Sequence, residues 1–337
     1  METPHPESVD DDDVTTALAT GWALKADMVR YVPKGGGSYH WIAEAGGEPA
    51  WFVTVDDLDT KPWIGATRDS VLAGLAAAYE AAFVLQHQAD LDFVVGPLQS
   101  SGGSVTVPLS EQYSMAVFPF VDGQAGSWGD PLDASLRETE LQMLASLHTS
   151  TVPSSVRIGR RALDLPERPM LLEALDSLDR PWEGGPLSEP ARHLLERHAG
   201  NVTARLEHFD LLADRLGETE DTCVVTHGEP HPGNLIQTPS GLRLIDWDTV
   251  ALARPERDLW MLDAGSADRF ATYEDRTGIR VDDTAIAFYR LTWTLSDIAC
   301  VAELFRSAHQ ESASVRQKWH AFGRLLEGES STPFGAP

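Results

Sequence analysis

The stretch His227-Gly228-Glu229-Pro230-His231-Pro232-Gly233-Asn234 is followed by Ile245-Asp246-Trp247-Asp248, in which Asp246 lies twelve residues after Asn234. The first stretch holds a carboxylate and an amide five residues apart, and its glycines and prolines predict a short loop. The second stretch places another carboxylate at the end of an apolar strand. Two acids and an amide in this order predict a site where oxygen ligands from neighbouring loops converge on a metal-bound phosphate.

The spacing His-x-acid-x-x-x-x-Asn repeats that of the catalytic loop in protein kinases. In that loop the acid accepts or orients the proton of the substrate hydroxyl, while the Asn and a later Asp bind Mg²⁺. Those roles fall here to Glu229, Asn234 and Asp246. The alternative is a turn that only links two strands. The hydrophobic hairpin and the second acid at the right distance argue against that alternative.

The amino-acid composition and net charge limit the kinds of molecule that the protein is expected to bind. The chain has 337 residues, 42% of them apolar, which is enough for one large domain or for two lobes with their own cores. Its 26 basic and 52 acidic residues give a net charge of −26. Nucleic acid is excluded as an expected partner because its backbone requires clustered positive charge. A cationic substrate fits better, although a diffuse acidic surface that aids solubility would also explain the charge.

No membrane segment is expected. The N-terminus lacks the basic region and the apolar core of a signal peptide. The longest apolar stretch, residues 286–305, is interrupted by Arg290, Asp297 and Glu303, which is typical of an amphipathic core helix. We therefore expect a cytoplasmic protein that does not bind a membrane.

The patterns along the chain predict an α+β fold with two lobes. Residues 1–13 are acidic and are expected to be disordered, with Asp13 capping the helix that follows. A β-rich N-lobe over 14–118 precedes a mostly helical C-lobe over 119–337, with the break at residues 118–123. The predicted strands lie at 29–32, 39–43, 50–55, 93–95 and 114–118, and the main helices at 69–88, 132–148, 189–216, 282–306 and 312–327.

The motifs at 227–234 and 245–248 resemble those of the aminoglycoside phosphotransferase family, within the wider set of choline- and fructosamine-kinase-like enzymes. The segment Arg254-Pro255-Glu256-Arg257-Asp258-Leu259 resembles the spectinomycin phosphotransferase branch in particular. The resemblance extends over nearly the whole chain after its acidic start. It implies a bilobal protein-kinase-like fold, Mg²⁺, ATP or GTP as co-substrate, and phosphorylation of a small-molecule hydroxyl, often one on an antibiotic.

The chain departs from the family pattern at two positions. Glu229 stands where the family usually has Asp, so its carboxylate lies one methylene further from the backbone. Thr54 stands where the family has its phosphate-binding Lys. Lys61 and Lys34 are the candidates to replace it, and Lys61 is favoured; an ammonium acts as a point charge, which tolerates relocation. Glu80, on the predicted helix 69–88, is the expected ion-pair partner of that lysine.

Two segments of the predicted N-lobe are expected to contact the nucleotide. The turn Gly35-Gly36-Gly37-Ser38 would lie over the triphosphate and donate backbone N–H groups to it. The segment 116–120, which contains Phe118, would offer backbone donors and acceptors to the purine edge. The residues leave ATP and GTP both open. Asp248 would either brace the metal loop or bind a second metal.

The substrate is expected between residues 150–215 and the C-terminal helices. Carboxylates near indoles suit an amino-bearing or sugar-like ligand. The acidic candidates are Asp164, Glu167, Glu173, Asp176, Asp179, Asp263 and Asp268, and the aromatic ones Trp182, Trp260, Tyr289 and Trp293. Three functions remain open: an antibiotic O-phosphotransferase, a kinase of an amino alcohol or sugar metabolite, and a non-catalytic pseudokinase that binds a ligand.

Overall fold

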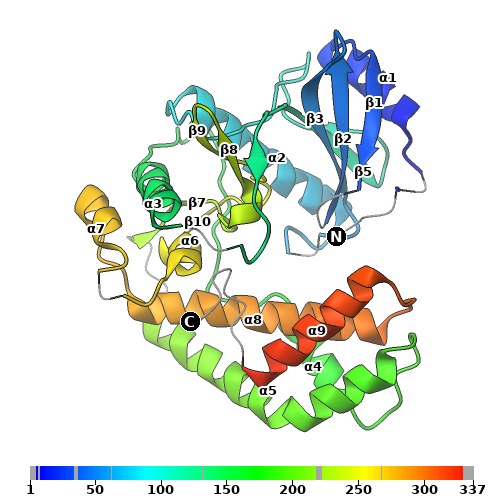
Figure 1. Cartoon of the computed structure of the whole chain (residues 1–337), viewed down its shortest axis with the longest axis vertical. Helices are drawn as coiled ribbons and strands as arrows, with labels where there is room; N and C mark the ends of the chain where they lie inside the picture. Colours follow the sequence, from blue (N-terminus) through cyan, green and yellow to red (C-terminus); the bar gives the residue numbers. More distant parts are fainter. Residues whose placement is uncertain are drawn as a thin grey trace. The chain divides into compact units, whose positions relative to one another are not determined.

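The computed structural model describes residues 5–6, 8–33, 37–61, 63–130, 133–217, 222–266 and 268–328. Lys34, Gly35 and Gly36 of the predicted phosphate turn lie outside the described residues. The chain forms two compact units (Figure 1). The first comprises Met1–Arg160, Val224–Ala253 and Ala271–Gly278, and the second Arg161–Cys223, Arg254–Phe270 and Ile279–Pro337.

The first unit contains an antiparallel five-stranded sheet in the order β1-β2-β3-β5-β4. Its strands are β1 (Met28–Val32), β2 (Ser38–Ala45), β3 (Glu48–Asp57), β4 (Val107–Pro108) and β5 (Tyr113–Pro119). Alternate side chains point to opposite faces of a strand. The odd-numbered residues of β2, β3 and β5, such as Trp41, Val53 and Val117, therefore share one face, and this face is apolar and buried.

Helix α1 (Asp11–Trp22) covers the apolar face through Val14, Leu18 and Trp22 (Figure 1). Asp10 caps this helix by accepting hydrogen bonds from the backbone N–H groups of residues 12 and 13. The prediction that residues 10–13 are disordered and that Asp13 is the cap is therefore wrong. A first turn of acids is favourable because their charge opposes the positive end of the helix dipole.

Helix α2 (Arg68–His87) packs on the other face of the sheet. Its buried residues Val71, Leu75 and Tyr79 contact Ala116 and Phe118 of β5. Towards the other end of this face the residues become polar, and the side chains that share it are Ser38, His40, Thr54 and Asp56. A buried polar strip on a sheet face requires partners for every group, and its contacts define the site described below.

His40 is held neutral within that polar strip. Its Nδ1 lies 3.4 Å from Thr54 Oγ1, and its ring packs against Phe52 with the ring centres 5.1 Å apart. The pKa of His40 is lowered from 6.5 to about 4, mainly by burial; Asp56 and Asp248 oppose this shift, and the ammonium of Lys61 adds to it.

The first unit continues beyond residue 118. Strands β6 (Gln124–Ala125), β8 (Leu235–Thr238) and β9 (Gly241–Leu244) form a small sheet, and β7 (Val224–Thr226) pairs with β10 (Ala251–Ala253). Helices α3 (Ala134–His148) and α7 (Ala271–Thr277) also belong to it. The expected strand 93–95 is reduced to one bridge at Val94, but its backbone bonds to Leu244 on both sides. This link joins β9 to the earlier chain, so the predicted break at 118/119 does not separate compact units.

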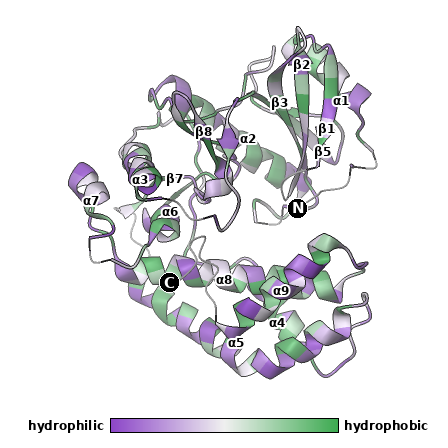
Figure 2. Ribbon diagram, in the orientation of Figure 1, coloured by the Kyte–Doolittle hydropathy of each residue, from purple (hydrophilic) through white to green (hydrophobic). Residues whose placement is uncertain are grey.

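The second unit is helical. It contains α4 (Arg168–Asp176), α5 (Ser188–Leu216), α6 (Glu256–Leu259), α8 (Asp283–Arg306) and α9 (Ala313–Glu327). Figure 2 shows hydrophobic and hydrophilic residues interspersed along α5 and α8. This amphipathic pattern lets each helix bury one stripe against its neighbours. Among the described residues, no helix is long and apolar enough to span a membrane.

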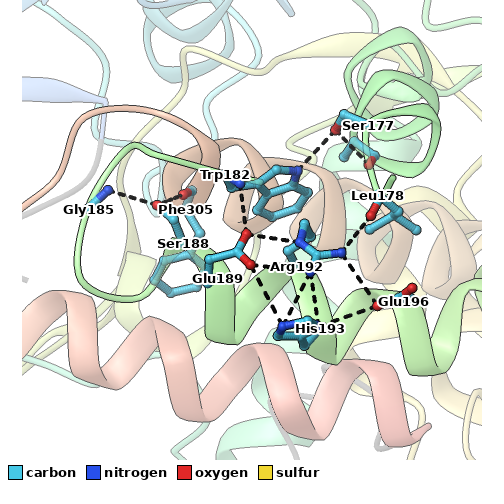
Figure 3. A network of polar contacts seen from close by, with 11 residues as sticks. Ser177, Leu178, Trp182, Gly185, Ser188, Glu189, Arg192, His193, Glu196 and Phe305 are labelled. Atoms are coloured by element: carbon cyan, nitrogen blue, oxygen red, sulfur yellow. Dashed lines mark hydrogen bonds and ion pairs between the residues drawn. The ribbon is translucent and has the colours of Figure 1, made fainter. Parts of the chain in front are cut away.

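A polar network fixes the connection between α4 and α5 (Figure 3). Glu189 accepts a hydrogen bond from the backbone N–H of Trp182 at 2.8 Å and one from Arg192 Nε at 2.9 Å. Arg192 also donates to the carbonyl of Leu178 at 2.6 Å, and the Trp182 indole donates to Ser177 Oγ at 3.1 Å. Trp182 is therefore held as a structural residue of the connection.

Replacing Leu75 by alanine should destabilise the first unit. Leu75 is 0% exposed between α2 and the sheet, and removing such a side chain costs about 2–5 kcal/mol because a cavity remains. Met28→Ala is the matched control in the same unit, since Met28 is 55% exposed. Urea unfolding should resolve the two variants, and equal losses of stability would contradict the described packing.

The stability of the sheet should fall in mild acid. His40 has a pKa of about 4 in the folded chain, compared with 6.5, so the unfolded chain binds the proton more readily. Its contribution is complete above pH 6.5 and is lost as the pH falls toward 4, by about 3 kcal/mol at most. His40→Gln should flatten the dependence of unfolding free energy on pH in this window, while His87→Gln, at an exposed position on α2, should not.

Candidate active site

The loop after β7 is held by His227, which is fully buried. Its Nε2–H donates to the carbonyl of Ile245 at 2.9 Å, and its Nδ1 accepts from the backbone N–H of Glu229 at 3.1 Å. These two bonds select one neutral tautomer. They also tie the segment that carries Glu229 to the segment that carries Asp246. The geometry agrees with a role for His227 in orienting the loop.

The side chain of Asn234 is fixed from the same loop. Its Nδ2 donates to the backbone carbonyl of Glu229 at 2.9 Å, and its backbone carbonyl accepts from the N–H of Ile245 at 3.0 Å. Because the amide nitrogen serves the protein, the amide oxygen points the other way as an acceptor. Hydrogen bonds within one unit thus join Glu229 and Asn234 to Ile245, the residue directly before Asp246.

Asp246 has an unusual backbone conformation, with φ of +68°. A non-glycine residue in the left-handed region costs free energy and persists only where its surroundings impose it. The imposing neighbour is Trp247, which is fully buried, donates its indole N–H to the carbonyl of Leu244 at 2.8 Å and packs edge-on against His227. The backbone is thereby bent so that the chain turns at the carboxylate.

Negative charge accumulates around Asp246. Burial raises its pKa well above the usual value, and the neighbouring carboxylates Asp248, Glu229 and Asp56 raise it further, while Lys61 opposes them. Such a group of acids is stable in its charged form when a cation lies among them. Within the described part of the chain, no cluster of three or more His, Cys, Asp or Glu side chains is arranged to hold a metal by itself. Mg²⁺ commonly takes only one or two carboxylates and completes its shell with phosphate and water.

Lys61 lies in the polar strip of the sheet, although it comes from the loop after β3. It is 1% exposed, and its Nζ lies 3.1 Å from Asp56 Oδ1, 2.9 Å from Asp248 Oδ2 and 3.0 Å from Ser38 Oγ. Burial acts to lower the pKa of Lys61, but the attraction of Asp56 and Asp248 is stronger and raises it. The ammonium remains charged.

The remaining predicted N-lobe residues divide into two groups. Gly37, with φ of +95°, lies near Lys61, since a Cβ built on it would be 3.9 Å from Lys61 Nζ. Ser38 bonds to Lys61, so both residues are brought to the lysine. The predicted ion pair between Lys61 and Glu80 is wrong. Glu80 is exposed and, with Asp69 and Leu72 on α2, lines a surface cavity.

Phe118 has a buried side chain that packs edge-on against Tyr79, with ring centres 5.5 Å apart. The backbone of β5 pairs with β3, and Phe118 is the register partner of Phe52. The side chain is therefore part of the core under α2, and any backbone contact to a ligand must come from the residues that follow it.

Several of the substrate candidates are occupied by structural contacts in the second unit. Asp263 binds Arg269 and Arg290, each at 2.6 Å, and Glu173 binds Arg306 at 2.7 Å. Trp182 and Trp260 are buried. These contacts and this burial assign four of the eleven candidates to the packing of the second unit.

Sequence reasoning missed Asp56 and Tyr79. Asp56 accepts from Ser38 Oγ at 2.7 Å and from the Tyr79 hydroxyl at 3.1 Å. The available signal was strand alternation, because Asp56 lies two residues after Thr54 and must share its face. Tyr79 had no comparable signal, since an aromatic residue on a buried helix face is ordinarily core.

Solved structures support the fold. The complex of spectinomycin phosphotransferase APH(9)-Ia with ADP and spectinomycin is 16% identical, with a TM-score of 0.75 over 95% of this chain and 98% of that one. Amicoumacin kinase hAmiN with AMP-PNP and Ca²⁺ is 13% identical, with a TM-score of 0.57 over 97% and 96%. A GDP and kanamycin complex of an APH(2″) enzyme is 16% identical, with a TM-score of 0.58 over 94% and 97%. The prediction of an α+β, protein-kinase-like fold is confirmed.

Sequence comparison adds the family. No curated protein matches this sequence significantly. The family model described as "Phosphotransferase enzyme family" matches residues 75–304, which is more than half of the chain and includes the loop from His227 to Asn234. The chain therefore belongs to the phosphotransferase enzyme family.

Proposed function

We propose that this protein is an ATP- and Mg²⁺-dependent O-phosphotransferase that inactivates an antibiotic by phosphorylating one of its hydroxyl groups. The observation that carries the proposal is the bonded group formed by Glu229, Asn234 and the Asp246 segment, with a buried lysine beside Asp248. Acceptor oxygens and one fixed cation are what phosphoryl transfer requires of a protein, since the reaction depends on positioning and charge neutralisation.

Each residue has one task in the proposed reaction. Glu229 accepts the proton of the substrate hydroxyl while that oxygen forms a bond to the γ-phosphorus. The bond between this phosphorus and the bridging oxygen breaks, and the nucleoside diphosphate leaves with the electron pair. Asn234 Oδ1 and the Asp246 carboxylate would hold Mg²⁺, and the crowding of acids around Asp246 fits a cation there. The bound ion would neutralise charge on the phosphates.

Lys61 would bind the phosphates of the nucleotide from the sheet side, with the turn at Gly37 and Ser38 beside it. A buried ammonium that keeps its charge is suited to this task because the exclusion of water strengthens its attraction to phosphate. Lys61 is favoured over Lys34, which lies outside the described residues.

The purine edge would be read just after Phe118. The backbone N–H of Phe120 donates to the carbonyl of Ala50 at 3.0 Å, and Phe118 pairs with Phe52 in the same ladder. In an antiparallel ladder alternate residues turn their backbone groups to opposite sides. The Pro119 carbonyl and the Val121 N–H therefore turn away from β3. A carbonyl acceptor next to an N–H donor matches the amino group and ring nitrogen of adenine, which favours ATP over GTP.

The proposed substrate class rests on the relatives and on charge. The relatives of known structure are complexed with spectinomycin, with kanamycin or with the ligand designated Ami. The net charge of −26 favours a cationic substrate over an anionic one. We therefore propose an amino-bearing antibiotic as the substrate and, because the reaction consumes ATP, the cytoplasm as the place of action.

Removing the proposed base should abolish turnover without preventing nucleotide binding. Glu229→Gln keeps the shape and the backbone bond to Asn234 but loses the proton acceptor, so kcat should fall by about 100-fold or more. Asp246→Asn should cause a similar loss that added Mg²⁺ does not restore. Product is measured by mass spectrometry as the addition of one phosphate group to compounds of an antibiotic panel.

The same panel separates the remaining functions. Expression in a sensitive bacterium should raise tolerance to one drug class, and Glu229→Gln should remove this tolerance. Turnover of an amino alcohol or sugar, with no protection against any antibiotic, would replace the proposal by a metabolite kinase. Nucleotide binding without any phosphorylated product would indicate a pseudokinase, the function that the substitutions at Thr54 and Glu229 would suit.

The adenine contact predicts a selective effect at residue 121. Val121→Pro removes one backbone donor and should raise the KM for ATP by about two- to tenfold, because a hydrogen bond contributes about 0.5–1.5 kcal/mol. Val121→Ala keeps the N–H and serves as the control. Steady-state kinetics with ATP and GTP test both points, and a lower KM for GTP than for ATP would refute the assigned base preference.

A further inference from the structure

We propose that Asp56, braced by Tyr79, positions the phosphate-binding Lys61, and that Asp56 and Tyr79 together take over the positioning task that a helix glutamate has in protein kinases. The inference rests on the proposed function, because it assigns to Lys61 the task of binding phosphate. It adds two positioning residues to that task, Asp56 on β3 and Tyr79 on α2.

The carboxylate of Asp56 is completely buried, and both of its oxygens have partners. Its Oδ1 lies 3.1 Å from Lys61 Nζ and accepts from Ser38 Oγ at 2.7 Å, while its Oδ2 accepts from the Tyr79 hydroxyl at 3.1 Å. A buried carboxylate with one cation and two hydroxyl donors is fixed in orientation, since moving it would leave a charge unpaired. The side chain therefore acts as a rigid seat for the ammonium.

The chain brings Lys61 back over the strand it has just left. Strand β3 ends at Asp57, whose carbonyl accepts from the N–H of Thr60 at 3.2 Å, and the carbonyl of Lys61 accepts from Ile64 at 3.0 Å. Arg68 donates two hydrogen bonds to the carboxylate of Asp59, from Nε at 2.7 Å and from Nη2 at 2.6 Å. This compact turn returns the side chain to the polar strip and leaves its ammonium between Asp56 and Asp248.

Helix α2 is connected to the lysine by Tyr79 and not by Glu80. Tyr79 is buried, faces the sheet and bonds to Asp56, whereas the next residue, Glu80, is exposed. Consecutive helix positions differ by about 100° in direction, so only one of the two can face the strip. The link between helix and phosphate-binding cation is thus a hydroxyl acting through a strand carboxylate.

The same face also carries Thr54, the position at which the family has its lysine. Thr54 precedes Asp56 by two residues, so both side chains point to the same side of β3. The residues opposite them on β5, Ala116 and Ser114, are small. A lysine placed at position 54 would therefore extend along the strip toward the same carboxylate, which makes relocation of the cation testable.

The test measures binding of AMP-PNP with Mg²⁺ by calorimetry, followed by the KM for ATP and kcat. Lys61→Met and Asp56→Asn should each weaken nucleotide binding by about tenfold or more, because each removes a charge-assisted contact. Tyr79→Phe should raise the KM by a few-fold with little change in kcat. Glu80→Gln, one residue along the same helix, is the matched control and should bind like the unaltered protein.

Moving the lysine from position 61 to position 54 gives a measurement that a purely structural role of Asp56 would not affect. The double variant Thr54→Lys with Lys61→Met should recover part of the lost affinity, and adding Asp56→Asn should remove that recovery. Thermal unfolding of every variant identifies losses of nucleotide affinity that are due to misfolding. If Lys61→Met or Asp56→Asn misfolds, Tyr79→Phe and the variants with Thr54→Lys test the proposal.

The outcomes are distinct. If the unaltered protein bound no nucleotide, the proposed function itself would fail. If it bound nucleotide and Lys61→Met weakened binding while Asp56→Asn and Tyr79→Phe did not, the lysine would keep its role and the positioning pair would be refuted. A loss in Glu80→Gln equal to that in Asp56→Asn would likewise overturn the inference.

Discussion

The arrangement of the first unit depends on one buried cation. The ammonium of Lys61 lies within 3.1 Å of carboxylates from β3 and from the segment after β9, at Asp56 and Asp248. Removing charges from water is costly, and the cost is offset only when geometry is good and every remaining group is bonded. Ser38 and Tyr79 supply those remaining bonds. These contacts hold the five-stranded sheet next to the segment that carries Asp248. Without them, the ammonium and the carboxylates would be buried without partners.

A second constraint acts on the acidic segment from the opposite side. His227 bonds to both Glu229 and Ile245, and Trp247 packs against its ring. Asp246 is left with a backbone conformation that an isolated chain would avoid. Local strain of this kind is stable only because the buried aromatic and the imidazole leave the backbone no alternative. The result is a carboxylate held rigidly among like charges, which raise its pKa and whose repulsion a bound cation would offset.

The departures from the family pattern are linked by the same geometry. Loss of the lysine at position 54 leaves a threonine beside a neutral histidine, and the charge reappears seven residues later through a turn. The solved structures compared above share the fold although they are at most 16% identical to this chain. The fold can therefore persist through such exchanges of residues. The position of the positive charge beside the sheet is kept, while the residue that supplies this charge can change with the path of the backbone.

Much of this protein could be predicted from local patterns. Alternation predicted β2, β3 and β5, and helical periodicity predicted α2, α5, α8 and α9. The spacing from Glu229 through Asn234 to Asp246 predicted two segments that hydrogen bonds from Asn234 to Glu229 and to Ile245 bring together. These features depend on residues close in sequence, so their signals lie within short windows. Family membership followed from the same short motifs.

The tertiary structure alone decided which groups pair across long separations. Lys61 and Asp248 are 187 residues apart, and no local rule distinguishes Asp56 or Tyr79 from ordinary strand and helix residues. The expectation for Glu80 failed because the rotation of α2 about its axis, set by packing of Leu75 and Tyr79 on the sheet, turns that residue to solvent. The sequence by itself determined which chemical groups are available. Only packing determined which of these groups pair with one another, because the unfolded chain allows many alternative contacts and burial in the folded chain selects one of them.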